Sequence, residues 1–345
     1  MNIETRDAGN NWTLYTLTNN NRMSVKLLDF GGIITEINVP NRDKTIDNVV
    51  LGYKHYADYE GNPNYFGAIV GRVAGRIKGA SFELEGKTYS LETNEGVHHL
   101  HGGSTGFHQV IWTAEPFQTA DTVGVTLTHT SLDGEGGYPG RVEVAVTYTL
   151  TNNNELIMDY SASTDKTTVL TLTNHSYFNL SGNLTETIHN HQVTMDSDEF
   201  VELDNELIPT GNKINVSQTP FDFRNGRKLA DGINSPTAQN IVADHGYDHY
   251  FIFNQNNIKN ISVKDENSGR IMEIKTNQPG VVMYTANTLG DDLALTEGNS
   301  KPYLGVCFET QASPASLHHE GFPTVFLKAH ERYEKQTVFS FSIVD

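Results

Sequence analysis

The sequence predicts an all-β protein: a large antiparallel β-sandwich with very little helix. Two observations predict this fold. Apolar residues alternate with polar residues over many short segments, as they do in strands that bury one face. Turn residues separate these segments, and the 345 residues include 30 glycines but only 11 prolines. No segment keeps a helical period over three turns, so two packed antiparallel sheets are expected.

The expected strands follow one another along the whole chain. In the first half they are Thr13–Thr18, Ser24–Phe30, Ile33–Val39, Asn48–Tyr53, Ser81–Glu85, Lys87–Leu91, Gln109–Phe117, Val123–Thr130 and Arg141–Leu150. In the second half they are Glu155–Ser163, a strand that opens at Val169, His191–Ser197, Phe200–Ile208, Asn260–Asp265, Ile271–Thr276 and Val338–Val344. Short helical turns are expected at Lys54–Tyr59 and Ala312–His318.

Turn residues join several of these strands into hairpins. Gly86 separates two short alternating segments, and three asparagines, residues 152–154, separate two longer ones. An Asn-Ser-Gly turn at 267–269 separates another pair. No linker, low-complexity tract or fixed repeat interrupts the pattern. We therefore expect a single β-sandwich domain that spans residues 1–345.

The composition excludes several classes of partner. The formal charge is −18 and no run of Lys or Arg occurs, which argues against nucleic acid and anionic membranes. The apolar stretches are too short to span a membrane, and the first residues show neither a basic segment nor an apolar run. Cys307 is the single cysteine, so no internal disulfide can form. A cytoplasmic location is expected.

A histidine ends the alternating stretch from Val169 to Gly182. Its leucines point to one face, while Thr171, Thr173 and His175 point to the other. The second face is expected to be wet, and a histidine on a rigid strand there is well placed to transfer protons. The alternative is a partly buried histidine whose nitrogens are satisfied by neighbouring hydroxyls.

A carboxylate occupies a similar position near the end of the chain. Val306 and Phe308 form one face of a strand, while Cys307, Glu309 and Gln311 lie on the other. On the concave side of a sheet Glu309 would face a cavity, and burial would raise its pKa toward that of a useful base. The alternative is an ordinary carboxylate that faces solvent.

Two further patterns partly match metal or catalytic motifs. His99 and His101 would share one face of a strand, a spacing that many metal sites use. The carboxylate that a cupin-type site needs is replaced by Ser104 and Thr105, so no metal is expected. Residues 102–106 match G-x-S-x-G, but a strand-like segment follows them instead of a helix, so a nucleophilic serine is not expected.

An arginine and an aspartate complete the candidate residues. Arg76 and Asp248 are the side chains that usually hold sugar hydroxyls, because together they supply donors and acceptors in fixed directions. Taken separately, each is also typical of a surface ion pair or a turn.

Taken together, these segments resemble the aldose 1-epimerases, also called galactose mutarotases. The similarity covers essentially the whole chain, and its motifs occur in the family's order. They are G-R-V-A-G-R-I at 71–77, L-H-G-G at 100–103, D-G-E-G-G-Y-P-G at 133–140, N-H-S-Y-F-N-L at 174–180, P-F-D-F-R at 220–224, Y-D-H at 247–249 and F-E-T-Q at 308–311.

The resemblance implies a β-supersandwich and a role for each candidate residue. His175 matches the family's general acid and Glu309 its general base. The residues that match sugar-binding positions are Arg76, His101, Asp248 and Tyr284, the last as an aromatic wall. Two positions depart from the pattern: some members have Asn where this chain has Gly75, and some have Gln where it has Val282. Both departures bear on which hydroxyls are recognised.

The implied activity is the interconversion of the α and β anomers of free hexoses such as galactose and glucose. It needs an acid and a base that act together, and no cofactor or metal. A hexose-6-phosphate 1-epimerase of the same fold and a non-catalytic carbohydrate-binding protein are the alternatives. A glycoside hydrolase that uses Asp248 and Glu309 is a further one. The preferred hexose, and the choice between monomer and homodimer, stay open at this point.

Overall fold

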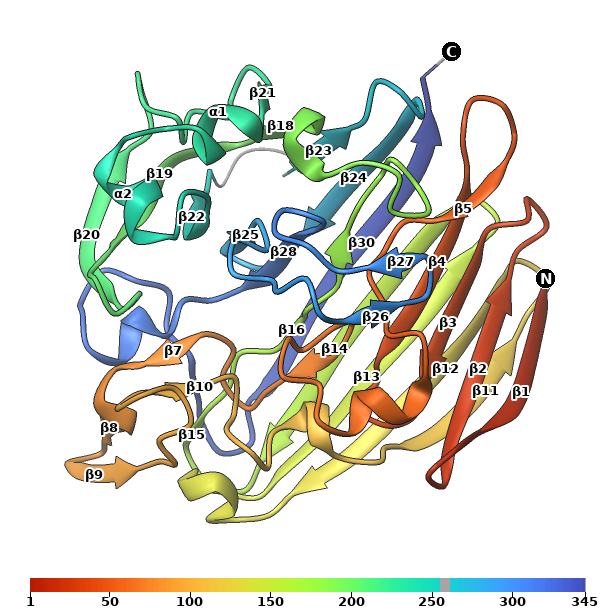
Figure 1. Cartoon of the computed structure of the whole chain (residues 1–345). Helices are drawn as coiled ribbons and strands as arrows, with labels where there is room; N and C mark the ends of the chain where they lie inside the picture. Colours follow the sequence, from red (N-terminus) through yellow and green to blue (C-terminus); the bar gives the residue numbers. More distant parts are fainter. Residues whose placement is uncertain (255–260, 345) are drawn as a thin grey trace.

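The computed structural model describes residues 1–254 and 261–344, and these form mostly antiparallel strands (Figure 1). The N-terminal sheet has five strands in sequence order: β1 (Asn2–Gly9), β2 (Trp12–Thr18), β3 (Ser24–Leu28), β4 (Ile34–Pro40) and β5 (Ile46–Asn48). Helices are short: α1 (Ala230–Ile233) and α2 (Ala238–Val242), with 3₁₀ turns η1 (Tyr56–Glu60), η2 (Lys78–Ala80), η3 (Phe107–Gln109), η4 (Glu135–Gly137), η5 (Ile188–Asn190) and η6 (Pro314–Leu317).

A nine-stranded sheet forms the broadest layer of the molecule. Its strands, in spatial order, are β11 (Thr113–Gln118), β12 (Thr122–Ser131), β13 (Val142–Thr151), β14 (Glu155–Thr164), β30 (Arg332–Ile343), β24 (Arg270–Thr276), β23 (Ile261–Lys264), β18 (Gln192–Met195) and β21 (Arg227–Lys228). The C-terminal strand β30 pairs with β14 on one side and β24 on the other, so the end of the chain lies in the middle of this sheet.

A six-stranded sheet carries three of the six candidate functional residues, Asp248, Tyr284 and Glu309. Its order is β17 (Tyr177–Phe178), β28 (Val306–Gln311), β25 (Gly280–Tyr284), β22 (Asp248–Phe253), β19 (Ser197–Leu203) and β20 (Pro209–Asn215). Two-stranded ladders complete the fold: β7 (Arg76–Ile77) with β10 (His99–Leu100), β6 (Ile69–Val70) with β16 (Thr173–Asn174), β15 (Thr168–Val169) with β29 (Phe326–Leu327), β8 (Ser81–Leu84) with β9 (Lys87–Ser90), and β26 (Ala294–Leu295) with β27 (Gly298–Asn299).

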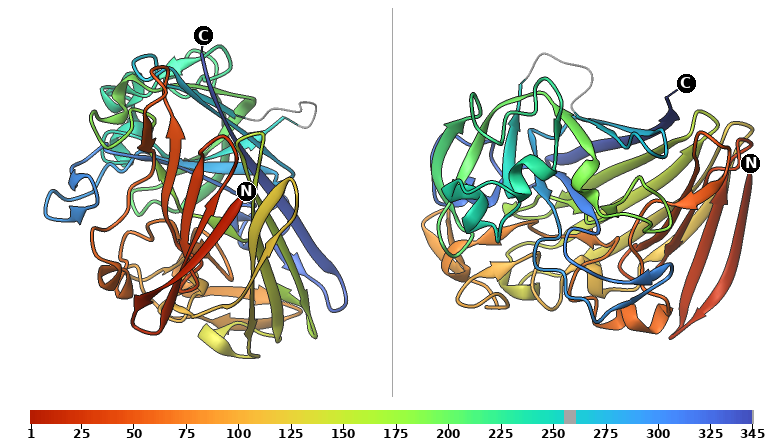
Figure 2. Two further views of the ribbon diagram at one scale, coloured as in Figure 1. Left: turned by 90° about the vertical axis from the view of Figure 1, so that its right-hand side faces the viewer. Right: turned by 45° about the horizontal axis from the view of Figure 1, so that its top comes forward.

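The three large sheets share one hydrophobic core. Leu27 of the N-terminal sheet, Val146 and Phe339 of the nine-stranded sheet, and Phe251 and Val281 of the six-stranded sheet belong to one cluster of buried side chains. Figure 2 shows the N-terminal strands (red) and the first strands of the nine-stranded sheet (yellow) as layers that meet near the N-terminus. The predicted all-β class is confirmed. Within the described residues, no helix has the length and apolarity needed to cross a membrane.

Most expected strands occur close to their predicted bounds, and the exceptions have local reasons. The segment expected at Asn48–Tyr53 ends as a strand at Asn48, with isolated bridges beyond it. The strand expected to begin at Gln109 begins at Thr113, because η3 precedes it. The strand expected at Phe200–Ile208 ends at Leu203 in a turn that leads into β20. Residue 260, the first of another expected strand, lies outside the described residues.

The stretch that opens at Val169 differs most from its prediction, because it has no wet face. It forms only the short pieces β15, β16 and β17, and every residue from 171 to 180 is buried. Thr171 lies in the interior, where its hydroxyl accepts a hydrogen bond from the Ala312 amide at 3.0 Å. The segment runs between layers and pairs with different partners in turn, so both its faces are covered. The side chains of Asn174 and Asn179 bind main-chain carbonyls, His175 lines a cavity, and none of the three faces bulk water.

Candidate active site

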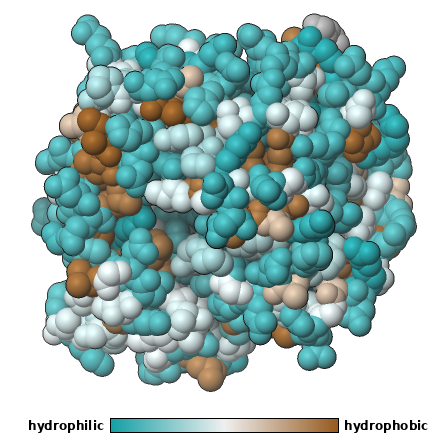
Figure 3. All heavy atoms as spheres, viewed as in Figure 1, coloured by the Kyte–Doolittle hydropathy of each residue, from teal (hydrophilic) through white to brown (hydrophobic). Residues whose placement is uncertain are grey.

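One cavity of about 220 Å³ brings together all of the residues that the sequence predicted as functional. Its lining includes Arg76, His101, His175, Asp248, Tyr284 and Glu309. The surface in Figure 3 is hollowed left of its centre, in the region that β7, β22, β25 and β28 surround in Figure 1. Residues that are far apart in the sequence thus form a single site.

The sheet register places three of these residues on neighbouring strands. Asp248 begins β22 and lies opposite Tyr284, which ends β25. Glu309 lies on β28 opposite Val282. Because side chains alternate along a strand, Tyr284 and Val282 lie on the same face of β25. The three strands therefore present their functional side chains to one side of the six-stranded sheet.

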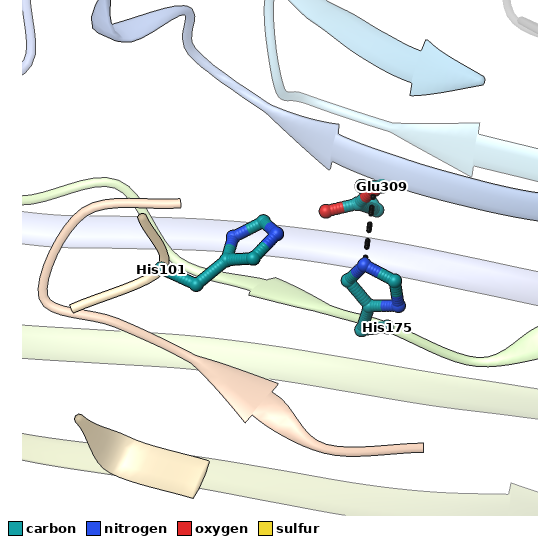
Figure 4. Close-up of side chains that lie close together, drawn as sticks. All are labelled: His101, His175 and Glu309. Atoms are coloured by element: carbon teal, nitrogen blue, oxygen red, sulfur yellow. Dashed lines mark ion pairs between the residues drawn. The ribbon is translucent and has the colours of Figure 1, made fainter. Parts of the chain in front are cut away.

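His175 and Glu309, which both line the cavity, form a close pair (Figure 4). The Nε2 atom of His175 lies 3.5 Å from Oε1 of Glu309. Only 4% of His175 and 3% of Glu309 is exposed, so bulk water does not separate them. Two hydrogen bonds tie the main chain of His175 to a neighbouring loop. The His175 amide donates to the Ala68 carbonyl, and the Gly67 amide donates to the His175 carbonyl. An imidazole and a carboxyl group are thus held face to face, as a proton-transferring pair requires.

Burial changes the acidity of both members of the pair. Burial raises the pKa of Glu309 well above its ordinary value, with a further contribution from Asp248 and an opposing one from Arg76. Burial lowers the pKa of His175 to about 4. Both shifts favour the neutral form of each group. An ionised Glu309 is therefore a stronger base than usual, and a protonated His175 is a stronger acid.

His101 lies beside this pair, and the three side chains could be read as a metal site. Their ligand atoms all lie within 4.8 Å of one another. The main-chain amide of Gly75, however, donates to Nδ1 of His101 at 3.1 Å, so the proton of the neutral ring sits on Nε2. A metal-bound histidine needs the opposite arrangement, with the distal nitrogen donating to an acceptor. The surroundings of His101 suit a hydrogen-bond donor to a ligand hydroxyl better than a metal ligand.

The predicted shared face of His99 and His101 is wrong. Strand β10 ends at Leu100, and His101 adopts a left-handed conformation with φ of 53°. His99 turns away from the cavity, where Nδ1 contacts the Glu92 carbonyl at 2.8 Å and Nε2 contacts the Tyr138 hydroxyl at 2.7 Å. The two imidazoles that are close in the sequence thus serve different parts of the structure.

Arg76 and Asp248 form an ion pair on the cavity wall. Nη1 of Arg76 lies 3.2 Å from Oδ2 of Asp248, and Nη2 lies 3.5 Å from Oε1 of Glu95. Burial raises the pKa of Asp248, although Arg76 opposes the shift. Burial alone would lower the pKa of Arg76, but Asp248 and Glu95 outweigh it and raise that pKa. The pair offers fixed donors and acceptors to a polar ligand.

The two departures from the family pattern both lie in the cavity wall. Val282 faces Glu309 across the ladder of β25 and β28. Gly75 has a φ of 90°, and a Cβ added there would lie 3.0 Å from Cγ of Pro314 and 3.3 Å from Nε2 of Gln311. A side chain at position 75 would press on this wall unless its neighbours moved. The cavity wall therefore has no polar side chain at positions 75 and 282.

Sequence reasoning missed several residues that surround the pair. Tyr65 and Tyr177 both line the cavity and pack against the ring of His175. Sγ of Cys307 lies 3.6 Å from Nδ1 of His175. The two-residue spacing from Glu309 predicted that Cys307 shares its face, and the same spacing relates Tyr177 to His175. Nothing in the sequence indicated the position of Tyr65. Tyr65 approaches His175 from a separate loop, whose residues Gly67 and Ala68 pair with the main chain of His175.

A strand-built cavity that holds an imidazole–carboxyl pair beside an Arg–Asp pair is suited to acid–base chemistry on a polar ligand. The aldose 1-epimerase family matches residues 13–340, and the chain belongs to this family. It is 39% identical to the galactose mutarotase of Bos taurus over 325 residues, which cover 93% of this chain and 92% of that protein. It is 35% identical to the aldose 1-epimerase of Haemophilus influenzae over 334 residues, 96% of each chain.

A solved structure agrees with the sequence comparison. The crystal structure of the galactose 1-epimerase from Lactobacillus acidophilus superposes with a TM-score of 0.89 at 27% identity, and the match covers 100% of this chain and 99% of that one. The predicted family and fold are thereby confirmed, as is the prediction of an isomerase of the epimerase type.

Proposed function

We propose that this protein is an aldose 1-epimerase that interconverts the α and β anomers of free hexoses such as galactose and glucose. The observation that carries the proposal is the pair of His175 and Glu309, with 3.5 Å between Nε2 and Oε1, inside a cavity that also holds the Arg76–Asp248 ion pair. The identity to galactose mutarotases and to an aldose 1-epimerase supports it.

The proposed reaction begins with ring opening. The Glu309 carboxylate takes the proton of the C1 hydroxyl, the C1–O5 bond breaks, and its electron pair goes to O5. His175 gives its Nε2 proton to O5, so the products are an open aldehyde, a protonated Glu309 and a neutral His175. The starting state has an imidazolium beside a carboxylate. It contains the same number of protons as the pair of neutral groups that burial favours, so one proton moves within the pair.

Ring closure reverses these steps after rotation about C1–C2. O5 attacks the other face of C1, His175 takes the proton from O5, and Glu309 returns its proton to the carbonyl oxygen. Both residues end as they began, so no further reactant is consumed. Each well-placed acid or base typically contributes about 10²–10⁴-fold to the rate.

The remaining cavity residues are proposed to hold the sugar. Arg76 and Asp248 would bind hydroxyls, His101 would donate from Nε2, and Tyr284 would form a wall against the ring. The hydroxyl of Tyr284 is 3.0 Å from Oγ1 of Thr288, and this contact fixes the aromatic ring at the rim. Because the site draws on residues from 76 to 309, we also propose that the chain works as a single domain.

The charge of the cavity favours a free hexose over the 6-phosphate alternative. Among the described residues that line it, Arg76 is the only Lys or Arg, and Asp248 and Glu95 already neutralise it. A phosphate would meet the carboxylates of Glu95 and Asp244 instead. A cytoplasmic location and a monomer or homodimer are parts of the same proposal, to be checked by cell fractionation and light scattering.

Polarimetry on freshly dissolved α-galactose and α-glucose tests the activity. We expect the protein to accelerate the change in optical rotation of at least one of these sugars. If neither sugar responds while a hexose 6-phosphate does, the phosphate alternative is correct. If binding occurs with no acceleration for any of them, the protein is a carbohydrate-binding protein.

A further inference from the structure

The ring of Tyr65 contacts three imidazoles in and beside the cavity, and the proposed mechanism gives this tyrosine no role. Its ring centroid lies 4.7 Å from that of His101, 4.7 Å from that of His108 and 5.8 Å from that of His175. The first two contacts are edge-to-face, an arrangement that aromatic pairs prefer and that restrains ring orientation. Three imidazoles from separate segments thus pack on one phenol ring.

The backbone of Tyr65 adopts a conformation that is uncommon for a bulky residue. Its φ is 55°, in the left-handed region. The side chain of Asn62 fixes this bend, because Oδ1 accepts from the Phe66 amide at 2.9 Å and Nδ2 donates to the Phe66 carbonyl at 3.2 Å. The Tyr65 amide also donates to the Asn62 carbonyl at 2.9 Å. A strained residue that its surroundings hold in place is typical of a functional site.

The loop that carries Tyr65 is tied to the chain that carries His175. The amide of Gly67 donates to the His175 carbonyl at 3.0 Å, and the amide of His175 donates to the Ala68 carbonyl at 2.9 Å. Nδ2 of Asn174 donates to the Gly67 carbonyl at 2.8 Å. Tyr65 therefore keeps a fixed position relative to the main chain of His175.

The ring of His175 packs against two tyrosine side chains. Tyr177 packs against it with a centroid distance of 5.1 Å, and Tyr65 approaches it from the 62–68 loop. His101 meets it edge-on at 5.2 Å. These contacts restrain rotation of the His175 ring, and that rotation decides whether Nε2 points toward Glu309.

We propose that Tyr65 is a positioning residue, whose ring holds His175 and His101 in their working orientations and keeps water away from His175. The role rests on the proposed function of His175 as the acid. It requires the ring and not the hydroxyl, since the contacts with all three imidazoles are made by the ring.

Two substitutions of Tyr65 distinguish the contribution of its ring from the contributions of its backbone conformation and its hydroxyl. Tyr65→Asn removes the ring but keeps a residue that tolerates a left-handed conformation. Tyr65→Phe keeps the ring and removes the hydroxyl. Tyr56→Asn is the matched control, because Tyr56 lies on η1 outside the cavity and bonds to Arg6. Thermal unfolding checks that each variant is folded, and Tyr65→Leu replaces the Asn variant if that one does not fold.

The kinetic result distinguishes positioning from direct contact with the sugar. We expect the ring-removing variant to lose on the order of 10- to 100-fold in kcat with little change in KM, because small misplacements of a catalytic group have effects of this size. The Phe variant and the Tyr56 control should keep wild-type kcat. A raised KM with unchanged kcat would show that Tyr65 binds the sugar, and a folded but inactive Phe variant would assign the role to the hydroxyl. Either result overturns the proposal.

A second readout does not depend on turnover. Nuclear magnetic resonance titration of the free enzyme gives the pKa of His175, whose signal is identified by its loss in His175→Asn. The charged and titratable groups around this ring are Glu309, Cys307, Tyr177, His101, His108 and Arg76. None of them changes in the Tyr65 variants. We expect the pKa to rise from about 4 toward the ordinary 6.5 when the ring is removed, and an unchanged pKa would contradict the proposal. If the wild type turned over no sugar, the proposed function would fail while this titration still tested Tyr65.

Discussion

Replacement of Glu309 by Gln removes the proposed base and keeps the size of the side chain. In the wild type Oε1 lies 3.5 Å from Nε2 of His175, and 3% of the residue is exposed, so water cannot readily replace the carboxylate. An amide cannot take the C1 hydroxyl proton. We therefore expect kcat to fall by about 10²–10⁴-fold, the usual contribution of a positioned base. That loss corresponds to roughly 3–5 kcal/mol of transition-state stabilisation.

Polarimetry measures the loss, and calorimetric titration with the sugar measures binding. Binding should stay near its wild-type strength, because the Arg76–Asp248 ion pair and Tyr284 are unchanged. Glu143→Gln is the matched control: its side chain is 59% exposed, it lies outside the cavity, and it should leave kcat unaltered. Wild-type turnover by a folded Glu309→Gln variant would refute the assignment of the base.

We also expect Glu309→Gln to change how the free energy of unfolding depends on pH. The pKa of Glu309 is raised in the folded state, so the carboxyl stabilises the fold most below its unfolded value of 4.5, and this contribution is lost as the pH rises through the folded-state pKa. The Gln side chain carries no such dependence. Relative to the wild type, the variant should therefore gain free energy of unfolding as the pH rises from 4.5. A difference in stability that does not change with pH would contradict the raised pKa.

Three further predictions concern other residues. His175→Asn should lower kcat by about 10²–10⁴-fold with a smaller effect on binding, as measured by polarimetry and titration calorimetry; an unchanged kcat would remove His175 from the mechanism. Asp248→Asn should mainly raise KM, because it weakens the hydrogen bond to a sugar hydroxyl and leaves both His175 and Glu309 in place. A fall in kcat alone would place Asp248 in the chemical step. Burial lowers the pKa of His249 to about 3 and that of His108 to about 4, both from 6.5. These rings stabilise the fold above pH 6.5 and lose that contribution as the pH falls toward 4, so urea unfolding should show a falling free energy over this window, and a flat profile would contradict it.

The alternating segments predicted the fold well where one face of a strand is buried. Strands β13 and β14 and the end of β30 follow their predicted bounds within a few residues, because burial on one side enforces the period of two. The alternation also indicated that Glu309 lies on the face opposite Val306 and Phe308. The gathering of Arg76, His101 and Asp248 in one cavity was implied only by the family resemblance. Local periodicity does not report contacts between distant segments.

The segment around His175 shows what periodicity cannot predict. Thr171 and Thr173 are both fully buried, although their alternation with leucines indicated a wet face. The pattern assumes that polar residues face solvent, whereas here they lie in the interior of the molecule, between layers. The left-handed His101 likewise accepts a tertiary hydrogen bond, from the Gly75 amide to its Nδ1, which local periodicity does not report.

His175 and Glu309 are proposed to act as one unit, and a double-mutant cycle measures whether they do. Polarimetry on the preferred α-hexose gives kcat for the wild type, His175→Asn, Glu309→Gln and the double variant. Residues that act in the same step have strongly non-additive effects. The account predicts that the double variant loses little more than the more impaired single variant. Losses that multiply in the double variant would show that the two residues act independently, and would contradict it.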